Sequence, residues 1–439
     1  MFSAVARIFR TPDLRRKIGF TLAIVALFRL GSFIPAPFVK FETVQACLTS
    51  VSSSPTAGLY ELVNLFSGGA LLQLSIFALG IMPYITASII VQLLRVVIPH
   101  FETLYKEGQS GQAKLTQYTR YLTIALGVLQ STTLITVAQN GQLLGPTCPD
   151  IFSTSSPAAM GLIIITMTAG TGLIMWMGEL ITERGVGNGM SLLIFTSIVS
   201  TFPSSFAGLA ANPEVGIEGL IGVILIGLLI IAAVIFVEQS QRRIPVQYAK
   251  RMVGRRTYGG NNTYIPIKVN MAGVVPVIFA SSLLYLPSLI AQFNTSPDGV
   301  NAPWVQWILD NLTTAQSPLY AALYFLLIVG FTYFYVAITF NPVEVADNMK
   351  KYGGFIPGIR AGRPTAEYLD YVLTRVTLPG SLYLGLVALI PLIALVALNA
   401  DQNFPFGGTS ILIMVGVGLE TVKQIDSQLQ QRHYEGLLR

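Results

Sequence analysis

Residues 219–237 read GLIGVILIGLLIIAAVIFV, and the chain then becomes polar at Glu238 and basic at Gln241-Arg242-Arg243. As a helix this stretch would be about 29 Å long at ~1.5 Å per residue, close to the ~30 Å thickness of a bilayer's hydrocarbon core. A helix satisfies its own backbone hydrogen bonds, so it can cross that layer. Because short cytoplasmic loops are enriched in Lys and Arg, the pattern predicts a membrane-spanning helix that ends at the cytoplasmic surface.

Similar apolar stretches recur along the chain, which is 52% hydrophobic and only 11% charged, too apolar for a soluble fold. The ten stretches are Ile18–Ile34, Leu72–Ile98, Tyr121–Ala138, Ala158–Leu180, Gly189–Phe206, Gly219–Val237, Met271–Ala291, Leu319–Phe340, Val376–Leu398 and Thr409–Val422. The second is long enough that we expect it to tilt or to break at Gly80 and Pro83. The basic start leads into the first stretch without a small-residue cleavage pattern, which indicates a retained helix rather than a removed signal.

Lys and Arg residues are concentrated in alternate loops, which are expected to lie on the same face of the membrane. Those expected on one face are Arg7, Arg10, Arg15, Arg16, Lys17, Lys106, Lys114, Arg184, Arg242, Arg243, Lys250, Arg251, Arg255, Arg256, Lys268, Lys350, Lys351, Arg360, Arg363 and Arg375, whereas the five loops of the other face contain only Lys40. This asymmetry predicts an all-α polytopic membrane protein with both chain ends in the cytoplasm. Five helices in each half, 1–206 and 207–439, imply that the second half is inverted if the two share a fold.

The first external loop contains a half-apolar segment too short to span, Leu59–Phe66, followed by Ser67-Gly68-Gly69. Two interpretations are open. The segment is either an amphipathic helix on the outer surface or a re-entrant segment that fills a cavity and swings on the two glycines.

The cytoplasmic loops 238–268 and 341–375 carry more positive charge than topology requires. The excess indicates docking to an acidic surface, such as RNA phosphates or an acidic protein. Turn-forming residues between Gly354 and Thr365 would give the second loop a fixed shape.

Charge is scarce within the apolar stretches, which disfavours a pump or ion-coupled carrier. Arg29, Glu179 and Glu420 lie toward the ends of helices, where snorkelling or a local ion pair is the expected role. Gln92 and Asn270 are expected to form interhelical hydrogen bonds.

Catalytic and cofactor motifs are absent from the sequence. His100 and His433 lie outside the apolar stretches and no G-x-x-x-x-G-K-[ST] phosphate loop occurs, so we predict neither an enzyme nor a bound cofactor or metal. Cys47 and Cys148 both map to the external face, where a disulfide or two free thiols are both compatible with the sequence. A small-solute transporter is disfavoured by the scarcity of buried charge, and an intramembrane enzyme by the absence of catalytic residues.

Several motifs together resemble the SecY/Sec61-alpha family, the channel subunits of Sec protein translocases. They are Phe66-Ser-Gly-Gly-Ala70, Ile76-Phe-Ala-Leu-Gly-Ile-Met-Pro-Tyr-Ile85, Ala87-Ser-Ile-Ile90, Gly178-Glu-Leu-Ile-Thr-Glu-Arg-Gly-Val-Gly-Asn-Gly189, Gln241-Arg-Arg-Ile244, Tyr248-Ala-Lys-Arg251, Lys268-Val-Asn-Met-Ala-Gly273, Phe279-Ala-Ser-Ser282, Gly358-Ile-Arg-Ala-Gly-Arg-Pro364 and Phe406-Gly-Gly-Thr-Ser410. They cover essentially the whole chain in order.

The resemblance implies ten transmembrane helices in two inverted five-helix halves that form a clamshell around a central pore. The pore would open sideways between helices two and three and helices seven and eight. It assigns a pore ring to Ile81, Ile85, Met190, Ile194, Ile278 and Ile413, and a lateral gate with polar residues Gln92 and Asn270. Segment 57–71 would be a plug, with Leu59, Tyr60, Leu62, Val63, Asn64, Phe66, Ser67, Gly68 and Gly69 as its main residues.

The resemblance also implies partners. Arg242, Arg243, Lys250, Arg251, Arg255, Arg256, Arg360 and Arg363 would dock the motor ATPase SecA or the ribosome, with Arg255, Arg256 and Arg360 leading. The expected assembly includes SecE and SecG in the bacterial plasma membrane and among its lipids. Its substrates would be unfolded secretory proteins with signal sequences, and hydrophobic segments would be released laterally into lipid.

Overall fold

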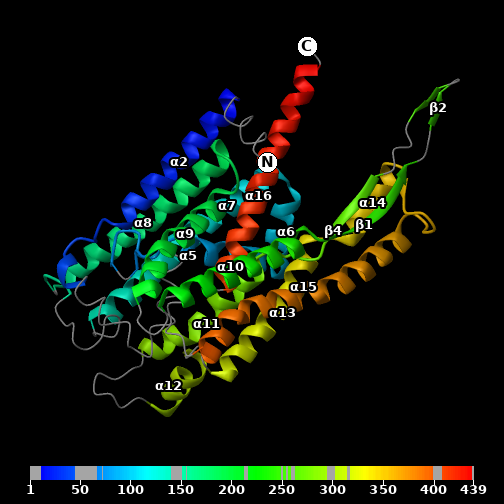
Figure 1. Ribbon diagram of the computed structural model, residues 1–439. Coiled ribbons are helices and arrows are strands. Elements are labelled where there is room, and N and C mark those ends of the chain that lie inside the picture. Colours follow the sequence, from blue (N-terminus) through cyan, green and yellow to red (C-terminus); the bar gives the residue numbers. More distant parts are fainter. Residues whose placement is uncertain are drawn as a thin grey trace.

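The computed structural model describes residues 11–44, 67–71, 73–139, 151–154, 156–211, 216–248, 251–253, 256–258, 263–293, 302–313, 317–398 and 408–437 (Figure 1). The long helices run side by side in one bundle. The strands and the C-terminal part of α16 (Gly408–Leu437) lie toward the upper end of the view, and α12 (Pro303–Ile308) lies at the opposite end. The segments predicted to be cytoplasmic and external are thus at opposite ends of the molecule.

Each predicted apolar stretch overlaps one long helix in the described ranges. These helices are α2 (Pro12–Ser32), α5 (Met82–Val97), α7 (Gln109–Gln139), α8 (Pro157–Arg184), α9 (Gly189–Ala211), α10 (Gly216–Gln239), α11 (Val275–Phe293), α13 (Pro318–Thr339), α15 (Arg363–Leu398) and α16 (Gly408–Leu437). Prolines begin several of them, since the first turn needs no backbone donor there. Ser156 caps α8 by accepting a hydrogen bond from the Ala159 amide.

Length and apolar composition alone identify fewer spans than the sequence predicts. Within the described residues, four helical stretches qualify: Gln109–Gln139, Pro157–Arg184, Pro318–Lys351 and Arg363–Ile390. A fifth is added if α5 and α6 (Pro99–Lys106), which meet at a bend of 100°, count as one span. The fold is therefore mostly helical and rich in apolar helices, while ten crossings stay a prediction.

The expected break in the second apolar stretch is confirmed. Described residues from Ser67 to Ile81 form turns, and α5 begins only at Met82, with Pro83 in its first turn. Gly80 has a positive φ of 56°, a backbone conformation that favours glycine. The turns pack against α2, where Phe28 and Phe77 stack with ring centroids 5.9 Å apart.

The first long basic loop is a β-ribbon rather than an irregular segment, a feature that its polar composition did not predict. Strand β1 (Gln241–Tyr248) pairs antiparallel with β4 (Thr263–Lys268) and with β5 (Gly354–Phe355). β2 (Arg251–Val253) pairs with β3 (Arg256–Tyr258). Ile244 and Val246 on one face of β1 are buried against α13, α15 and α14 (Pro342–Lys351), so the ribbon is anchored to the helical bundle.

The two halves of the chain touch along unequal seams. On one side, α9 packs broadly against α10 and α16. On the other side, α11 makes only slight contacts with α5 and α7, although α5 packs tightly on α7 and α11 on α13. The two halves are therefore joined by broad contacts along one edge and by slight contacts along the other.

Candidate functional site

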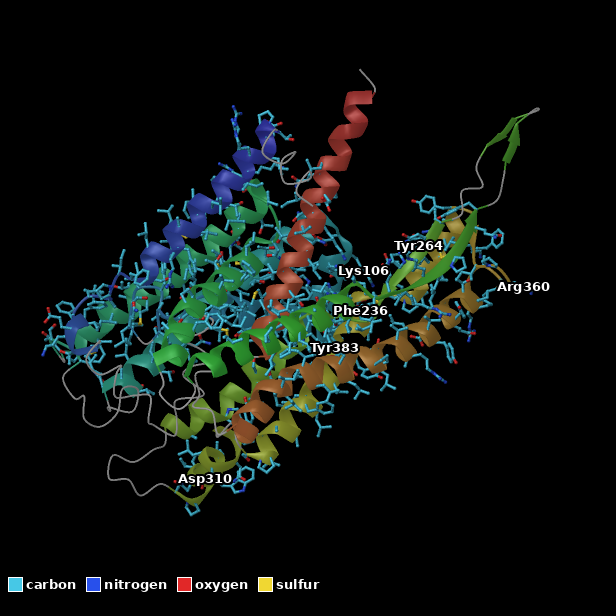
Figure 2. The ribbon with its side chains drawn as sticks, in the orientation of Figure 1. Lys106, Phe236, Tyr264, Asp310, Arg360 and Tyr383 are labelled. Atoms are coloured by element: carbon cyan, nitrogen blue, oxygen red, sulfur yellow. The ribbon has the colours of Figure 1, made fainter. Side chains whose placement is uncertain are left out.

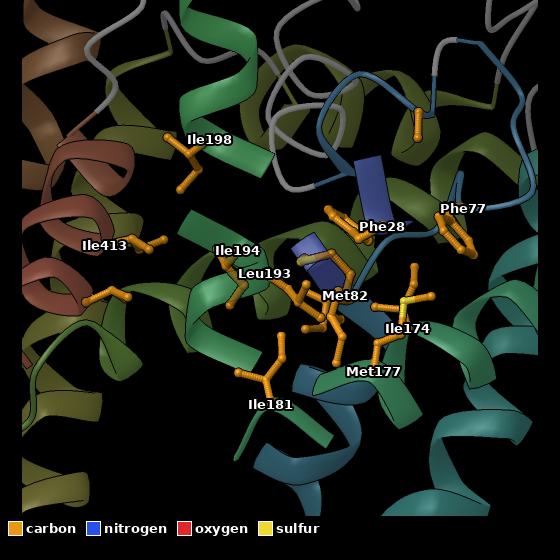
Figure 3. Close-up of a cluster of buried hydrophobic side chains, with 14 of the residues drawn as sticks. Phe28, Phe77, Met82, Ile174, Met177, Ile181, Leu193, Ile194, Ile198 and Ile413 are labelled. Atoms are coloured by element: carbon orange, nitrogen blue, oxygen red, sulfur yellow. The ribbon is translucent and has the colours of Figure 1, made fainter. Parts of the chain in front are cut away.

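The six residues predicted to form a ring lie in one hydrophobic cluster between the two halves (Figure 3). Ile81 precedes α5, Ile85 is on α5, Met190 and Ile194 are on α9, Ile278 is on α11 and Ile413 is on α16. Figure 3 shows Ile194 and Ile413 on neighbouring helices. Ile81 and Ile413 are each only 2% exposed, so these two side chains are shielded from solvent within the cluster.

The Met190 side chain packs against a glycine of α8. A Cβ at Gly178 would lie 2.4 Å from the Met190 sulfur, so glycine lets that side chain lie against α8 without having to shift. A flexible thioether fits such an irregular gap. The chain therefore keeps the cluster apolar at Met190 without a branched aliphatic residue.

An open cavity of about 580 Å³ adjoins this cluster. Its walls come from α5, α7, α8, α9 and α11, and four residues of the predicted ring line it: Ile85, Met190, Ile194 and Ile278. The same cavity is lined by Gln92, Arg120 and Glu179. The site is thus an open space, lined by both polar and apolar side chains, that adjoins the apolar cluster.

The most ordered polar feature of the cavity is an ion pair between α7 and α8. Arg120 donates two hydrogen bonds to Glu179, from Nε to Oε1 at 2.9 Å and from Nη2 to Oε2 at 2.7 Å. The local pair expected for Glu179 is confirmed. Its partner was missed because Arg120 directly precedes the apolar stretch that begins at Tyr121, and a single sequence does not show which helices are neighbours.

Gln92 and Asn270 do not lie together. Gln92 lines the cavity, and its side-chain amide donates to the Ser88 hydroxyl at 3.5 Å; since both residues are on α5, this bond is within one helix and not the expected interhelical one. Asn270 precedes α11, outside the cavity lining, and donates hydrogen bonds to Glu238 and to the carbonyl of Gly273. Glu238 follows the predicted span 219–237, and burial raises its pKa, with the hydrogen bond from Asn270 acting in the opposite direction.

Ser67, Gly68 and Gly69 form the described end of the predicted plug. Both glycines have positive φ, 67° and 89°, a backbone conformation that favours glycine. Ala70 is fully buried in the same cluster as the ring residues. The predicted plug residues Leu59, Tyr60, Leu62, Val63, Asn64 and Phe66 lie outside the described residues, as do Cys47 and Cys148.

The predicted docking residues fall on the β-ribbon and on the turn before α15. Arg242 and Arg243 are exposed on β1, and Arg243 lies 4.9 Å from the centroid of the Tyr264 ring. Arg360 is exposed, and Figure 2 shows it at the same end of the molecule as Tyr264 and far from Asp310. Arg363 pairs with Glu367 at 2.9 Å. Arg251 and Arg256 belong to β2 and β3, and Lys250 and Arg255 lie outside the described residues.

Comparisons with known proteins identify the family of this chain. The SecY family model matches residues 75–422. Curated relatives named "Protein translocase subunit SecY" include one from Streptomyces scabiei, 62% identical over 444 residues, and one from Micrococcus luteus, 59% identical over 442 residues. In both cases the match covers 100% of this chain and 100% of the relative.

Solved structures share the fold at low sequence identity. A structure described as "The structure of a protein conducting channel" matches with a TM-score of 0.59 and 20% identity, covering 93% of this chain and 91% of that one. Sec61 in the canine ribosome-channel complex matches with a TM-score of 0.56 and 18% identity over the same shares. Because the family model spans most of the chain and the relatives align along its full length, this chain belongs to the SecY family.

Proposed function

We propose that this protein is the channel-forming subunit of a Sec translocase. In this role it conducts unfolded secretory proteins across the membrane and releases hydrophobic segments sideways into lipid. The observation that carries the proposal is the apolar cluster shared by both halves at the edge of an open cavity with polar and apolar walls. Bulky aliphatic side chains can move aside for a passing chain and still exclude water and ions when they close.

The unequal seams support a clamshell with a lateral gate. Contact between α9, α10 and α16 would serve as the hinge, and the slight contact of α11 with α5 and α7 as the opening. Breaking few contacts costs little free energy, so the loosely packed side opens first. A signal sequence would enter there because burying its apolar surface is worth about 25 cal/mol per Å². Because the signal sequence would bind the open state more tightly than the closed state, its binding shifts the equilibrium toward the open state.

Segment 57–71 would be the plug on the external side. The support is that its described end, at Ala70, packs directly into the ring's cluster. Gln92 on the cavity wall is the proposed polar residue of the gate. Asn270 would act at the cytoplasmic end of α11, since its partners are Glu238 and Gly273.

The cytoplasmic surface would receive the ribosome or the SecA motor, and SecE and SecG would complete the assembly in the bacterial plasma membrane with both ends of this chain inside. The related Sec61 was solved in a ribosome-channel complex. Arg242, Arg243 and Arg360 are exposed and carry no side-chain salt bridge among the described residues, so they are available to an acidic partner.

Crosslinking tests the channel. A photoreactive residue at Ile81 or Ile278 should crosslink to a secretory chain stalled during export, because both side chains belong to the ring. The matched control is Leu229 on α10, which is 71% exposed on the outside of the bundle and should give no crosslink. If the ring positions stay uncrosslinked while the purified protein takes up a small solute, the protein is a transporter instead.

Reversing the charge of Arg360 tests the docking surface. Arg360→Glu should slow motor-driven export severalfold while membrane insertion and stability of this protein stay normal, because an exposed side chain contributes little to folding. Arg363→Glu is the comparison, since Arg363 already pairs with Glu367 and we expect the smaller effect. Export rates measured in inverted membrane vesicles decide; an unchanged rate for Arg360→Glu removes the docking role.

A further inference from the structure

Arg29 lies where a positive charge is energetically unfavourable. It lies within the first predicted span, Ile18–Ile34, toward the end that topology places outside. A cation costs free energy in the apolar layer, and at the outer end it does not serve as a cytoplasmic topology signal. Such a residue needs a specific partner.

Its partner is a backbone carbonyl of the turn that follows the plug segment. Arg29 Nη1 donates a hydrogen bond to the carbonyl oxygen of Gly68, and the guanidinium lies 4.6 Å from the centroid of the Phe33 ring. The ring partly replaces the water that the cation loses. Arg29 therefore ties α2 to the turn through a charge-assisted hydrogen bond, one of the stronger kinds in proteins.

The turn also lies against α9. A Cβ at Gly68 would lie 3.2 Å from the Ser197 Cα, so the backbone of the turn approaches α9 as closely as a glycine allows. The turn also has bonds of its own, because the Leu71 amide donates to Ser67 Oγ at 3.1 Å and the Ser75 amide to the Ala70 carbonyl at 3.1 Å. It can thus move as a unit.

We propose that Arg29 is a positioning residue that locks the turn 67–71 against α9 and so keeps Ala70 in the ring's cluster while the channel is closed. The proposal rests on the channel function proposed above. Moving the turn away from the pore requires the bond between Arg29 and Gly68 to break. Because the acceptor is a backbone carbonyl, the lock depends on the position of the turn and not on its side chains.

Arg29→Gln and Arg29→Lys in the full chain, assembled in the complete translocase, test the lock. Arg29→Gln should raise resting ion conductance in planar bilayers, and export of a precursor with a defective signal sequence, on the order of tenfold, the effect of losing one charge-assisted bond. Arg29→Lys keeps a charged donor and should fall between Arg29→Gln and the parent. Arg95→Gln is the control, since Arg95 stacks on Tyr105 instead, at 3.9 Å from the ring centroid.

A double-mutant comparison separates the lock from a general loss of stability. Gly68→Ala and Gly69→Ala both place alanine at positive φ, but only position 68 would contact Arg29 and Ser197. The conductance effects of Arg29→Gln and Gly68→Ala should be non-additive, because both act on one contact, and those of Arg29→Gln and Gly69→Ala should add.

Two results would overturn the lock. One is unchanged resting conductance and signal requirement in Arg29→Gln. The other is an effect of Arg29→Gln that adds equally to Gly68→Ala and Gly69→Ala. In either case the parent still exports precursors with intact signals, whereas failure of the parent to export any precursor would instead refute the channel function.

Discussion

At the scale of single residues, the structure explains charges that the sequence left without partners. Glu179 receives two hydrogen bonds from Arg120 and Arg29 donates to Gly68, so these two ionic groups beside the apolar layer have defined partners. Glu238 differs, because its partner is the neutral Asn270 and burial raises its pKa. It is the residue at which proton binding and folding should be coupled.

Glu238→Gln tests this coupling. A carboxyl whose pKa is raised in the folded state binds its proton more tightly there than in the unfolded chain, so stability declines as pH rises from about 4.5 through the folded-state pKa. Gln removes that decline, and the variant at pH 7 should be at least as stable as the parent. Thermal unfolding of the parent and the variant in lipid nanodiscs measures how the stability of each depends on pH. Glu102→Gln is the control, because the hydrogen bond from Lys106 lowers the pKa of that exposed carboxyl; an equally steep decline in Glu238→Gln would contradict the assignment.

At the scale of elements, glycines on α8 let other segments approach its backbone. A Cβ at Gly170 would lie 2.0 Å from the carbonyl oxygen of Ile76, and Gly178 makes room for Met190. The non-helical part of the second apolar stretch is thus packed directly onto α8. This contact places the turns beside the pore.

Gly170→Ala should therefore displace the turns at Ile76 and destabilise the protein by about 1–3 kcal/mol, the usual effect of overpacking. The matched control is Gly172→Ala on the same helix, where a Cβ would meet Ile124 Cδ1 at an ordinary 3.6 Å. That variant should be neutral or slightly stabilising, since alanine favours helix by about 1 kcal/mol over glycine. Thermal unfolding of both variants decides, and equal effects would show that the close approach to Ile76 does not matter.

At the scale of the whole molecule, the ring cluster joins the two halves, and in the proposed channel it would also seal the pore. Ile413 from the second half is buried beside Ile81 and Ile194 from the first. A side chain with both roles should affect stability and conductance together.

Ile413→Ala should cost about 2–5 kcal/mol of stability through the cavity it leaves, and should raise resting ion conductance. Ile413→Leu conserves volume and should change both much less. Leu229→Ala is the control. Leu229 is exposed on the outside of the bundle and lies outside the cluster, so this variant should leave the resting conductance unchanged. Bilayer recordings measure the conductance, and thermal unfolding measures the stability. A loss of stability without added conductance would show that Ile413 has a packing role only.

Sequence alone determined which segments are apolar helices, where the second one breaks and where the basic loops lie. These properties depend on local composition, on proline and glycine, and on the free-energy cost of polar groups in lipid. Family resemblance added the ring positions, whose proximity the structure then shows. Tertiary structure alone decided that Arg120 meets Glu179, that Arg29 meets Gly68, that Asn270 lies apart from Gln92 and that the basic loop is a β-ribbon. Each of these depends on which segments pack together, and apolar helices present similar surfaces to lipid and to one another, so composition does not specify their neighbours.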